Sequence, residues 1–443
     1  MPKKKTALTI EERLQQALVP AEEQPYEVPE NWVWVRLIGN VNSCLDGYRK
    51  PINSSERAKR VGKVPYYGAT GQVGWIDDYL TNEHLVLLGE DGAPFLDLLK
   101  DKAYIIFGEA WVNNHAHILK SYFGEIGNVF LMHYLNMVDY KDYVKGTTRL
   151  KLTQGSMQLM PFPLPPLSEQ QRIVERIEEL FAKLDEAKER LQEVADSFAV
   201  RKAAILHKAF TGELTKQWRW ENGVSYESWE EVSLKELSSV IGDGLHGTPV
   251  YSENGDYYFI NGNNFDDSFI AIKESTKRVS IEEYKKYAVN LNDNTVFLSI
   301  NGTLGKTAFY NGEPVILGKS ACYINVGEKL DKRFLKEMFH TNAFINYANQ
   351  KATGSTIKNL GLKAIREYLV PLPSLPEQHE IVRLIDDLLA RERAAQQAAE
   401  QALASIDLMK KSILARAFRG ELGTNKASEA SALELLKQVL AEN

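Results

Sequence analysis

One stretch of this 443-residue chain occurs twice: residues 163–214 return, with related sequence, as residues 371–422, an offset of 208. Each copy opens with P-L-P-x-L-x-E-Q and ends with A-F-x-G-E-L. A helix of about 40 residues fits between these ends and would be about 60 Å long. Ser374 and Glu377 have the spacing of a capping box, and Ser168 is the predicted N-cap of the first copy. The repeat therefore predicts two long helices, each leading out of one globular segment.

Apolar residues recur along both copies in alternating steps of four and three, which is the heptad pattern of a coiled coil. Arg201 is the one charged residue that breaks this row in the first copy. Alanine in the second copy often stands where the first copy has leucine, which favours antiparallel packing of the two helices. A full overlap would place Val194 near Glu392 and Leu184 near Ala402. The alternative is that each helix covers only its own globular segment. The predicted seam comprises Leu184, Leu191, Phe198, Leu388, Ala395 and Ala402.

The globular segments before the two helices are also related to each other. Both open with W-x-x-V-x-L, at Trp32 and at Trp229, and both close with a small polar loop, at Gly146 and at Gly354. Short β-branched and aromatic runs between Gly, Asn and Asp turns predict strands with a few helices. The predicted fold is α+β, with two mixed, β-rich domains separated by a pair of long antiparallel helices in an internal pseudo-two-fold repeat. The expected order is an N-terminal arm at 1–30, a domain at 31–165, a helix region at 166–222, a second domain at 223–373, a second helix region at 374–423 and a tail at 424–443.

The composition is typical of a globular chain, with 44% hydrophobic and 10% aromatic residues. No apolar run approaches the ~20 residues of a membrane span, and the N-terminal segment lacks the apolar core of a signal peptide. We therefore expect a cytoplasmic protein without a membrane partner. The two cysteines, Cys44 and Cys322, lie far apart in the sequence, which argues against a disulfide framework and against a cysteine metal site.

Motifs that resemble enzyme sites lack the surroundings that such sites need. G-x-G-x-x-G at 242–247 is followed by Pro249, where the helix of a dinucleotide site should begin. The run N-N-H-A-H at 113–117 alternates like one face of a strand and has no cysteine or acidic partner at zinc spacing. No G-x-S-x-G elbow is present. We expect no catalytic residues and no metal site, which leaves recognition as the chemistry of the chain.

Loops rich in Tyr, Asn, Thr and Lys suit DNA binding, because Asn reads adenine, Arg and Lys read guanine, and hydroxyl groups bind phosphate. The net charge of -6 is low for such a protein, but the basic strip from Arg49 to Lys63 can bind phosphate locally. Candidates in the first domain are Arg49, Lys50, Arg60, Lys63, Tyr66, Tyr67, Thr70, Asn113, Thr147, Thr148 and Arg149. Candidates in the second domain are His246, Thr248, Asn261, Asn263, Asn264, Asn301, Lys306, Lys319, Ser355, Thr356 and Lys358.

Over residues 25–423 the sequence resembles the specificity subunits of type I restriction-modification systems. The resemblance is carried by the two repeated motifs, by PYYGATG, EDGAP and WVNNHAH in the first domain, and by DGLHGTP and INGTLGKTA in the second. It implies two target recognition domains, each of which reads one half of a bipartite target in double-stranded DNA. It also implies that the helices set the spacer between the half-sites.

The resemblance further implies the partners and cofactors of an assembly. Two modification subunits would dock on this chain, carry S-adenosylmethionine and methylate adenine. Restriction subunits would add translocation and cleavage that depend on ATP and Mg. The chain itself would bind no cofactor, since it lacks N-P-P-[FY] and a glycine-rich cofactor loop. Two other interpretations stay open: a self-sufficient DNA methyltransferase, and a structural coiled-coil adaptor.

Overall fold

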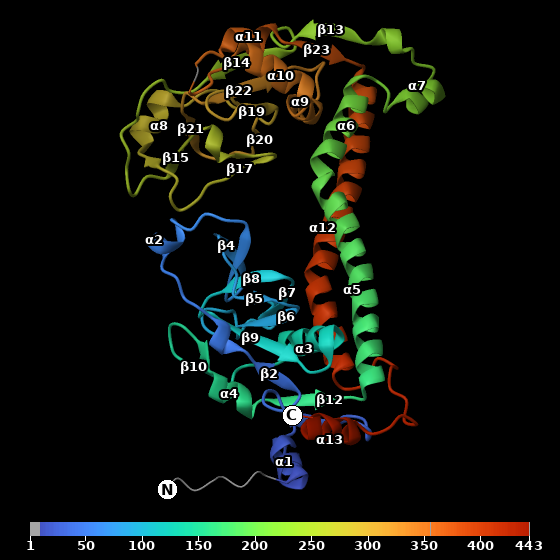
Figure 1. Cartoon of the computed structure of the whole chain (residues 1–443). Helices are drawn as coiled ribbons and strands as arrows, with labels where there is room; N and C mark the ends of the chain where they lie inside the picture. Colours follow the sequence, from blue (N-terminus) through green and yellow to red (C-terminus); the bar gives the residue numbers. More distant parts are fainter. Residues whose placement is uncertain (1–8, 355, 443) are drawn as a thin grey trace. The chain divides into compact units, whose positions relative to one another are not determined.

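The computed structural model describes residues 9–354 and 356–442, which form two compact units (Figure 1). Unit 1 comprises Met1–Gln192 and Glu400–Asn443, and unit 2 comprises Glu193–Ala399. Each unit holds one globular domain together with parts of both long helices, so the predicted order of domain, helix, domain, helix is confirmed. Within the described residues, no helix combines the length and the apolar character that a membrane crossing requires.

The domain of unit 1 contains two four-stranded sheets, with strand orders β2-β9-β6-β7 and β4-β3-β8-β5. Helix α3 lies against β6, β7 and β9, and β1 pairs antiparallel with β12 where the chain enters and leaves the domain. The strands are β1 Val33–Arg36, β2 Asn42–Cys44, β3 Val64–Gly68, β4 Gly71–Ile76, β5 Thr81–Asn82, β6 Leu85–Gly89, β7 Ala103–Ile106, β8 Glu109–Val112, β9 Ala116–Ser121, β10 Val144–Lys145, β11 Lys151–Leu152 and β12 Pro161–Leu164. Its α-helices outside the long pair are α1 Ile10–Ala17, α2 Ser54–Arg57, α3 Gly124–Met137, α4 Gln154–Leu159 and α13 Ala432–Glu442.

The domain of unit 2 is built around a four-stranded sheet of order β14-β22-β19-β20 and a three-stranded sheet of order β18-β15-β21. Strands β13 and β23 pair at its entrance as β1 and β12 do in unit 1. The strands are β13 Glu230–Ser233, β14 Ser238–Asp243, β15 Tyr257–Ile260, β16 Phe265–Asp266, β17 Phe269–Ile270, β18 Arg278–Val279, β19 Thr295–Ser299, β20 Thr307–Phe309, β21 Val315–Leu317, β22 Ala321–Val326 and β23 Leu369–Leu372. The shorter α-helices are α7 Lys216–Asn222, α8 Ile281–Tyr287, α9 Lys332–Phe339, α10 Asn342–Lys351 and α11 Leu362–Glu367.

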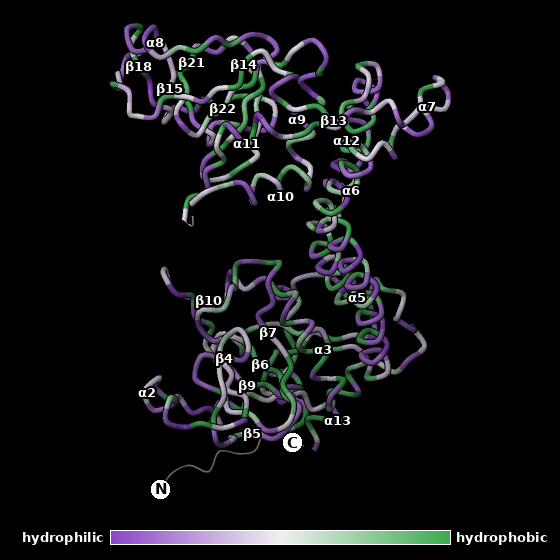
Figure 2. Tube along the Cα trace, turned by 90° about the horizontal axis from the view of Figure 1, so that it is seen from above, coloured by the Kyte–Doolittle hydropathy of each residue, from purple (hydrophilic) through white to green (hydrophobic). Residues whose placement is uncertain are grey.

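The central strands β6 and β19 are buried at every position, which explains why their sequences are apolar runs and do not alternate. Figure 2 shows the apolar residues gathered at the strands of each domain. Thr295 and Ser299 are the exceptions in β19. The Thr295 hydroxyl donates to Asn325 Oδ1 at 2.7 Å, and the Ser299 hydroxyl donates to Thr303 O at 2.6 Å. Each fully buried leucine, valine or phenylalanine contributes about 1.5–3 kcal/mol to these cores.

The second copy of the repeat forms one uninterrupted helix, α12 (Leu375–Ala417), as predicted. The first copy differs, because it is divided into α5 (Leu167–Asp196) and α6 (Phe198–Phe210) at Ser197. The Ser197 hydroxyl donates to a backbone carbonyl one turn earlier at 2.7 Å and accepts a hydrogen bond from Arg201. Such bonds compete with the backbone ladder of a helix and bend it. The prediction of a single helix is therefore wrong for the first copy.

Inside each unit the two helices run antiparallel, and charged side chains mark their register. In unit 1, Lys410 Nζ lies 2.6 Å from Asp185 Oδ1. In unit 2, Arg201 forms an ion pair with Glu392. The predicted contact between Val194 and Glu392 is wrong, because Glu392 faces Arg201, one heptad further along. The two charges that interrupt the apolar rows thus neutralise each other.

The predicted seam residues differ in burial, and one of them is exposed. The half-buried members are Leu184, Leu191, Phe198, Leu388 and Ala402. Ala395 is exposed, whereas Leu389 and Ala399 are buried on the same helix. A straight helix turns once per 3.6 residues, so positions assigned from a strict 3.5-residue repeat drift away from the contact face.

A buried glutamate near the start of α5 joins three parts of unit 1. Glu169 accepts hydrogen bonds from the Trp32 indole at 2.8 Å, from Asn425 at 2.8 Å and from Thr424 at 3.3 Å. Trp32 opens the domain, and the other two residues follow α12, so Glu169 ties the domain and the end of the chain to α5. Helix α5 begins one residue before Ser168, which is therefore not its N-cap.

The equivalent glutamate of α12 does the same in unit 2. Glu377 accepts hydrogen bonds from the Trp229 indole at 3.0 Å and from Thr215, which follows α6, at 2.7 Å. It also forms a buried ion pair with Arg219 at 2.6 Å. Both carboxylate oxygens are taken by these side chains, so the capping box predicted for Ser374 and Glu377 is wrong. We call these two sets, each a glutamate with its three partners, the glutamate clasps.

The A-F-x-G-E-L motif that ends each long helix has a packing role. Phe418, after α12, packs on Phe130 of α3 with ring centroids 5.1 Å apart. Phe210, at the end of α6, packs on Phe334 of α9 at 4.9 Å. The glycine two residues later has a φ of 73° in one copy and 74° in the other, a conformation that suits glycine after a helix end. Each motif therefore anchors a helix end in the core of a domain.

The N-terminal arm belongs to unit 1. Helix α1 packs against α13, which follows the second repeat. The arm continues along the domain, where Val19 N donates to Trp34 O at 3.0 Å. Two predicted appendages, 1–30 and 424–443, thus meet within unit 1 over the residues that the structure describes.

The two clasps differ in charge, and this difference predicts different costs of mutation. Glu377→Gln removes the ion partner of Arg219, whose side chain is 8% exposed, so we expect a loss of about 3 kcal/mol or more in unfolding free energy. Glu169→Gln removes charge from hydrogen bonds with neutral donors, and we expect a loss of about 1 kcal/mol. Urea unfolding of both variants measures the two costs. Equal losses would contradict the role given to Arg219.

Candidate nucleic-acid interface

The structure brings two short loops of unit 1 together at the end of β6. The turn at 90–92 follows β6, and the small polar loop at 146–152 leads into β11. Leu152 N donates to Glu90 O at 2.8 Å, and Gly92 N donates to Leu150 O at 3.4 Å. Asp91 and Lys151 form a β-bridge between these two bonds. The loops therefore form one continuous surface supported by the sheet.

Unit 2 builds the same arrangement at the end of β19. Leu360 N donates to Ile300 O at 2.8 Å, and Gly302 N donates to Lys358 O at 2.9 Å. Asn301 and Asn359 form the β-bridge. We call this arrangement the paired-loop platform: 90–92 with 146–152 in unit 1, and 300–302 with 354 and 356–360 in unit 2.

Glycine conformation is shared by the two platforms. Gly92 and Gly302 have φ values of 72° and 78°, and Gly146 and Gly354 have 120° and 91°. A Cβ on Gly146 would lie 2.4 Å from Arg149 O, and a Cβ on Gly354 would lie 2.3 Å from a carbonyl oxygen at the same place. Both loops therefore need glycine for the close approach of backbone to backbone, which explains the repeat of this residue in the sequence.

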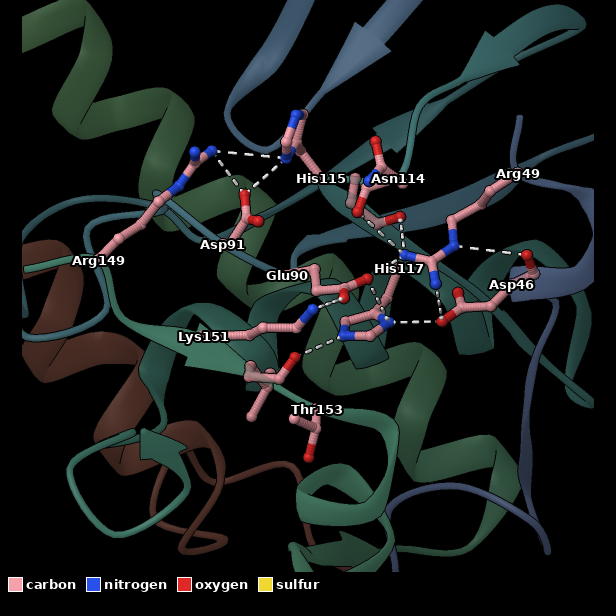
Figure 3. Close-up of polar contacts among 12 residues, drawn as sticks. Asp46, Arg49, Glu90, Asp91, Asn114, His115, His117, Arg149, Lys151 and Thr153 are labelled. Carbon is pink, nitrogen blue, oxygen red and sulfur yellow. Dashed lines mark hydrogen bonds and ion pairs between the residues drawn. The ribbon is translucent and has the colours of Figure 1, made fainter. Parts of the chain in front are cut away.

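A charge network that is largely buried, apart from Lys151, supports the platform of unit 1 (Figure 3). Glu90 accepts from Lys151 Nζ at 2.8 Å and pairs with Arg49. Arg49 also binds Asp46 at 2.9 Å. His117, which is buried, lies with Nδ1 2.6 Å from Asp46 and Nε2 2.9 Å from a backbone carbonyl of β11. The network thus links strands β9 and β11 and the turn after β6, and it holds the loops above it.

The two acids of this network stay ionised. Burial by itself would raise the pKa of Glu90, but hydrogen bonds from Lys151 and Arg49 outweigh it and lower that pKa. Burial likewise opposes ionisation of Asp46, and the bond from His117 is the main reason that the Asp46 pKa is lowered. Ionised acids keep their ion pairs with Lys151 and Arg49, so the base of the platform stays ion-paired at neutral pH.

Cys44, Asp46 and His117 each place a possible metal-ligand atom within 4.8 Å of one another, the one such group found in the part of the chain that is described. Both His117 nitrogens already have partners, and the Arg49 guanidinium lies against Asp46. Burial raises the pKa of the Cys44 thiol to about 12, so the thiolate that a metal needs is disfavoured. The group fits structural support.

Three exposed or half-exposed side chains lie above this base. Arg149 Nη2 donates to Asp91 Oδ1 at 2.7 Å, and His115 Nδ1 lies 2.7 Å from the same oxygen. The Arg149 side chain is 59% exposed and that of His115 is 39% exposed. Together with the exposed Thr147, Thr148 and Lys151, they form the polar surface of the platform in unit 1.

The sequence-predicted residues of unit 1 fall into three groups. The exposed ones are Lys50, Lys63, Thr70, Thr147, Thr148 and Arg149. The half-buried ones are Arg49, Arg60 and Tyr67, and the buried ones are Tyr66 and Asn113. Arg49 is engaged in the network, Arg60 pairs with Asp77 at 2.6 Å, and Tyr66 packs in the core. The platform brings together Thr147, Thr148 and Arg149, and it leaves Tyr66 and Asn113 as supporting residues.

Unit 2 exposes more of its predicted residues. The exposed ones are His246, Thr248, Asn263, Lys306, Lys319, Thr356 and Lys358, and the half-buried ones are Asn261, Asn264 and Asn301. Asn261 and Asn264 form a local cap, with Asn261 N donating to Asn264 Oδ1 at 3.0 Å. Ser355 lies outside the described residues. The platform of unit 2 brings together Asn301, Thr356 and Lys358.

Sequence reasoning missed Asp91 and gave His115 no role. A signal was present, because the E-D-G turn after β6 stands at nearly the same repeat position as the I-N-G turn after β19. That Asp91 meets Arg149 depends on loop pairing between residues 58 positions apart, and no local pattern predicts it.

Comparison with known proteins identifies the family. The family model of the type I restriction modification DNA specificity domain matches residues 29–196 and 226–402. The chain is 27% identical over 365 residues to the putative type I restriction enzyme specificity subunit S.HindORF215P of Haemophilus influenzae, covering 79% of this chain and 86% of that protein. It is 24% identical over 447 residues to the EcoDI specificity subunit of Escherichia coli, covering 94% and 96%.

The fold agrees with a solved relative. The HsdS subunit from Thermoanaerobacter tengcongensis superposes with a TM-score of 0.57 at 18% identity, over 90% of this chain and 100% of that one. The two matched segments of the family model cover the two domains, helix α5 and the first part of helix α12. The chain therefore belongs to the family of type I restriction-modification DNA specificity domains and contains two of them.

Proposed function

We propose that this chain is the non-catalytic DNA-recognition subunit of its complex and that each domain reads one half of a bipartite target. The observation that supports this most is the paired-loop platform, which occurs once in each unit. Recognition residues typically lie on loops that a rigid scaffold positions. The two platforms have equivalent backbone hydrogen bonds but different side chains. This suits two domains that each recognise a different DNA sequence.

The exposed candidates divide by the contact that each would make. Lys50, Lys63, Lys306 and Lys319 are exposed and form no ion pair within the described residues, so they suit phosphate contacts. The hydroxyl groups of Thr147 and Thr148 suit phosphate or base edges, and the amide of Asn301 suits adenine. Phosphate contacts position the protein, and the platform residues carry the selectivity.

The long helices set the spacer between the half-sites in this proposal. Helix α12 is continuous over Leu375–Ala417, and its first part belongs to unit 2 and its last part to unit 1. A continuous helix has a fixed rise of about 1.5 Å per residue. It is therefore suited to fix the length of the spacer between the half-sites, whose bases the protein does not contact in this proposal.

The catalytic steps belong to partners in this proposal. Two modification subunits dock on the chain and supply S-adenosylmethionine for adenine methylation, and restriction subunits supply ATP- and Mg-dependent cleavage. The net charge of -6 supports a division of labour, because an acidic chain attracts phosphate weakly and needs basic surfaces on its partners.

Exchange of one domain tests whether the two readers are independent. We replace residues 33–164, from β1 to β12, with the matching segment of the Haemophilus influenzae relative and map methylated adenines in cells that carry the complete complex. One half of the methylated sequence should change and the other should stay, because the exchanged segment folds within unit 1. The reciprocal exchange of 230–372 is the control and should change the other half. A change in both halves after either exchange would contradict two independent readers.

Lengthening the helices tests the spacer. One heptad is inserted after Gln192 and another after Ala399, so that both helices grow equally and their register is kept. Seven helical residues add ~10 Å, which corresponds to about three base pairs at 3.4 Å each. We expect both half-sequences to be retained with a spacer longer by up to three pairs, depending on the tilt of the helices to the DNA. Full activity with the original spacer would show that the helices do not set it.

A further inference from the structure

The platform of unit 1 contains an arrangement that the platform of unit 2 lacks. Arg149 is held by Asp91, whereas the repeat-equivalent positions in unit 2 are Ile357 and Asn301. Ile357 is 62% exposed, and Asn301 reaches Asn359 Oδ1 at 3.5 Å. One platform thus presents a guanidinium, and the other presents amides and an apolar side chain.

The position of the Arg149 guanidinium is defined from two sides. Asp91 Oδ1 accepts from Nη2 at 2.7 Å, and a Cβ built on Gly92 would lie 3.3 Å from both Nε and Nη2. The guanidinium therefore lies over the bare α-carbon of Gly92. Nε and Nη1 form no hydrogen bond among the described residues, so donors remain for a ligand. A guanidinium held in this way loses less conformational entropy when it binds than a free arginine does.

The carboxylate that holds Arg149 is itself held. His115 Nδ1 lies 2.7 Å from Asp91 Oδ1, and the His115 backbone is fixed because Glu90 N donates to His115 O at 2.8 Å. Glu90 belongs to the buried network beneath (Figure 3). Asp91 therefore lies between the ion-paired base and the exposed arginine.

Stability alone does not account for this arrangement. Arg149 is 59% exposed, and an ion pair with so exposed a partner contributes little to folding. An aspartate close to bound DNA would also repel phosphate. Its presence is explained if the orientation of Arg149 matters more than the added negative charge.

We infer that Arg149 reads a guanine in the half-site of unit 1, and that Asp91, supported by His115, is the positioning residue that aims it. This inference rests on the proposed function. The donors of an arginine match the O6 and N7 acceptors that guanine presents in the major groove. Unit 2, without a guanidinium at this place, reads its half-site by other contacts.

The test measures how much binding depends on one atom of the DNA, N7 of a guanine. Mapping of methylated adenines first defines the half-site that changes when residues 33–164 are exchanged. Duplexes are then made in which each guanine of that half-site is replaced in turn by 7-deazaguanine, which lacks the N7 acceptor. Binding of the complete complex, with its modification subunits, is measured for each duplex. The readout is the ratio of Kd for the substituted duplex to Kd for the unsubstituted one.

We expect one guanine to give a ratio of about 10, near the lower end of what a bidentate arginine contact provides. In Arg149→Ala and Arg149→Lys the ratio at that guanine should fall to about 1, because lysine keeps the charge but not the planar fork. Asp91→Asn should lower the ratio while non-specific affinity stays equal or rises, since an acid has been removed. The double variant Asp91→Asn/Arg149→Ala should equal Arg149→Ala, because the two act through one contact.

Matched controls come from the exposed Lys120–Glu83 ion pair of the same unit. Lys120→Ala and Glu83→Gln remove similar charges and should leave the ratio unchanged. Thermal melting should be unchanged in the Arg149, Lys120 and Glu83 variants, since those side chains are 59%, 43% and 49% exposed. Asp91 is only 19% exposed, so melting of Asp91→Asn is measured alongside binding to separate loss of positioning from loss of fold.

Two results would overturn the inference. One is a ratio that no Arg149 variant changes, including the case of a half-site without guanine. The other is an Asp91→Asn variant that tightens binding to every duplex equally, which would make Asp91 a simple repulsive charge. A wild-type complex with no sequence-selective methylation at all would instead refute the proposed function.

Discussion

The structure of each unit depends on a buried carboxylate near the start of a long helix. Glu169 and Glu377 are both 0% exposed, and each collects donors from the first tryptophan of its domain and from the segment that follows the other helix. Such a group is costly to bury unless every lone pair is satisfied. The requirement to satisfy it selects one arrangement of domain, helix and returning segment. In unit 1 the returning segment is the end of the chain, so Thr424 reaches Glu169 across 255 residues.

The clasps and the platforms lie at different places in each domain and have different roles: the clasps stabilise the fold, and the platforms present polar side chains. In each unit the clasp, the phenylalanine anchor (Phe418 in unit 1, Phe210 in unit 2) and the buried strands form the packed body. The platforms use backbone bonds between two loops and positive-φ glycines to present polar side chains from that body. Because the bonds are made by backbone atoms, side chains such as Arg149 and Ile357 can differ between the copies without changing the loops. The two copies therefore keep the same loop conformation while the side chains that they present differ.

The order of the elements could be predicted from the sequence, because a long repeat with in-register motifs leaves few alternatives. The details of packing could not. Heptad spacing does not distinguish a 3.5-residue repeat from the 3.6 of a straight helix, so Ala395 was assigned to the seam although it is exposed. The break at Ser197 depends on a bond from Arg201, and the pairing of Arg201 with Glu392 depends on tertiary register. Glu377 at capping-box spacing looks the same in a sequence whether its carboxylate caps a helix or binds a buried arginine.

At the candidate site, too, the sequence does not reveal which charged residues pair with each other in the fold. These pairs determine how much positive charge an acidic chain has available for DNA. Two of the six basic residues in the strip are neutralised internally: Arg49 by Asp46 and Glu90, and Arg60 by Asp77. A count of basic residues therefore overstates the attraction of this surface for phosphate. In the proposed function, non-specific binding by the chain alone is weak because its net charge is -6, and it falls further as salt rises. Selectivity is the ratio of specific to non-specific affinity. In the proposed function, low background attraction raises that ratio, so that a few well-held donors on the platforms would discriminate sequences while partners supply the remaining affinity.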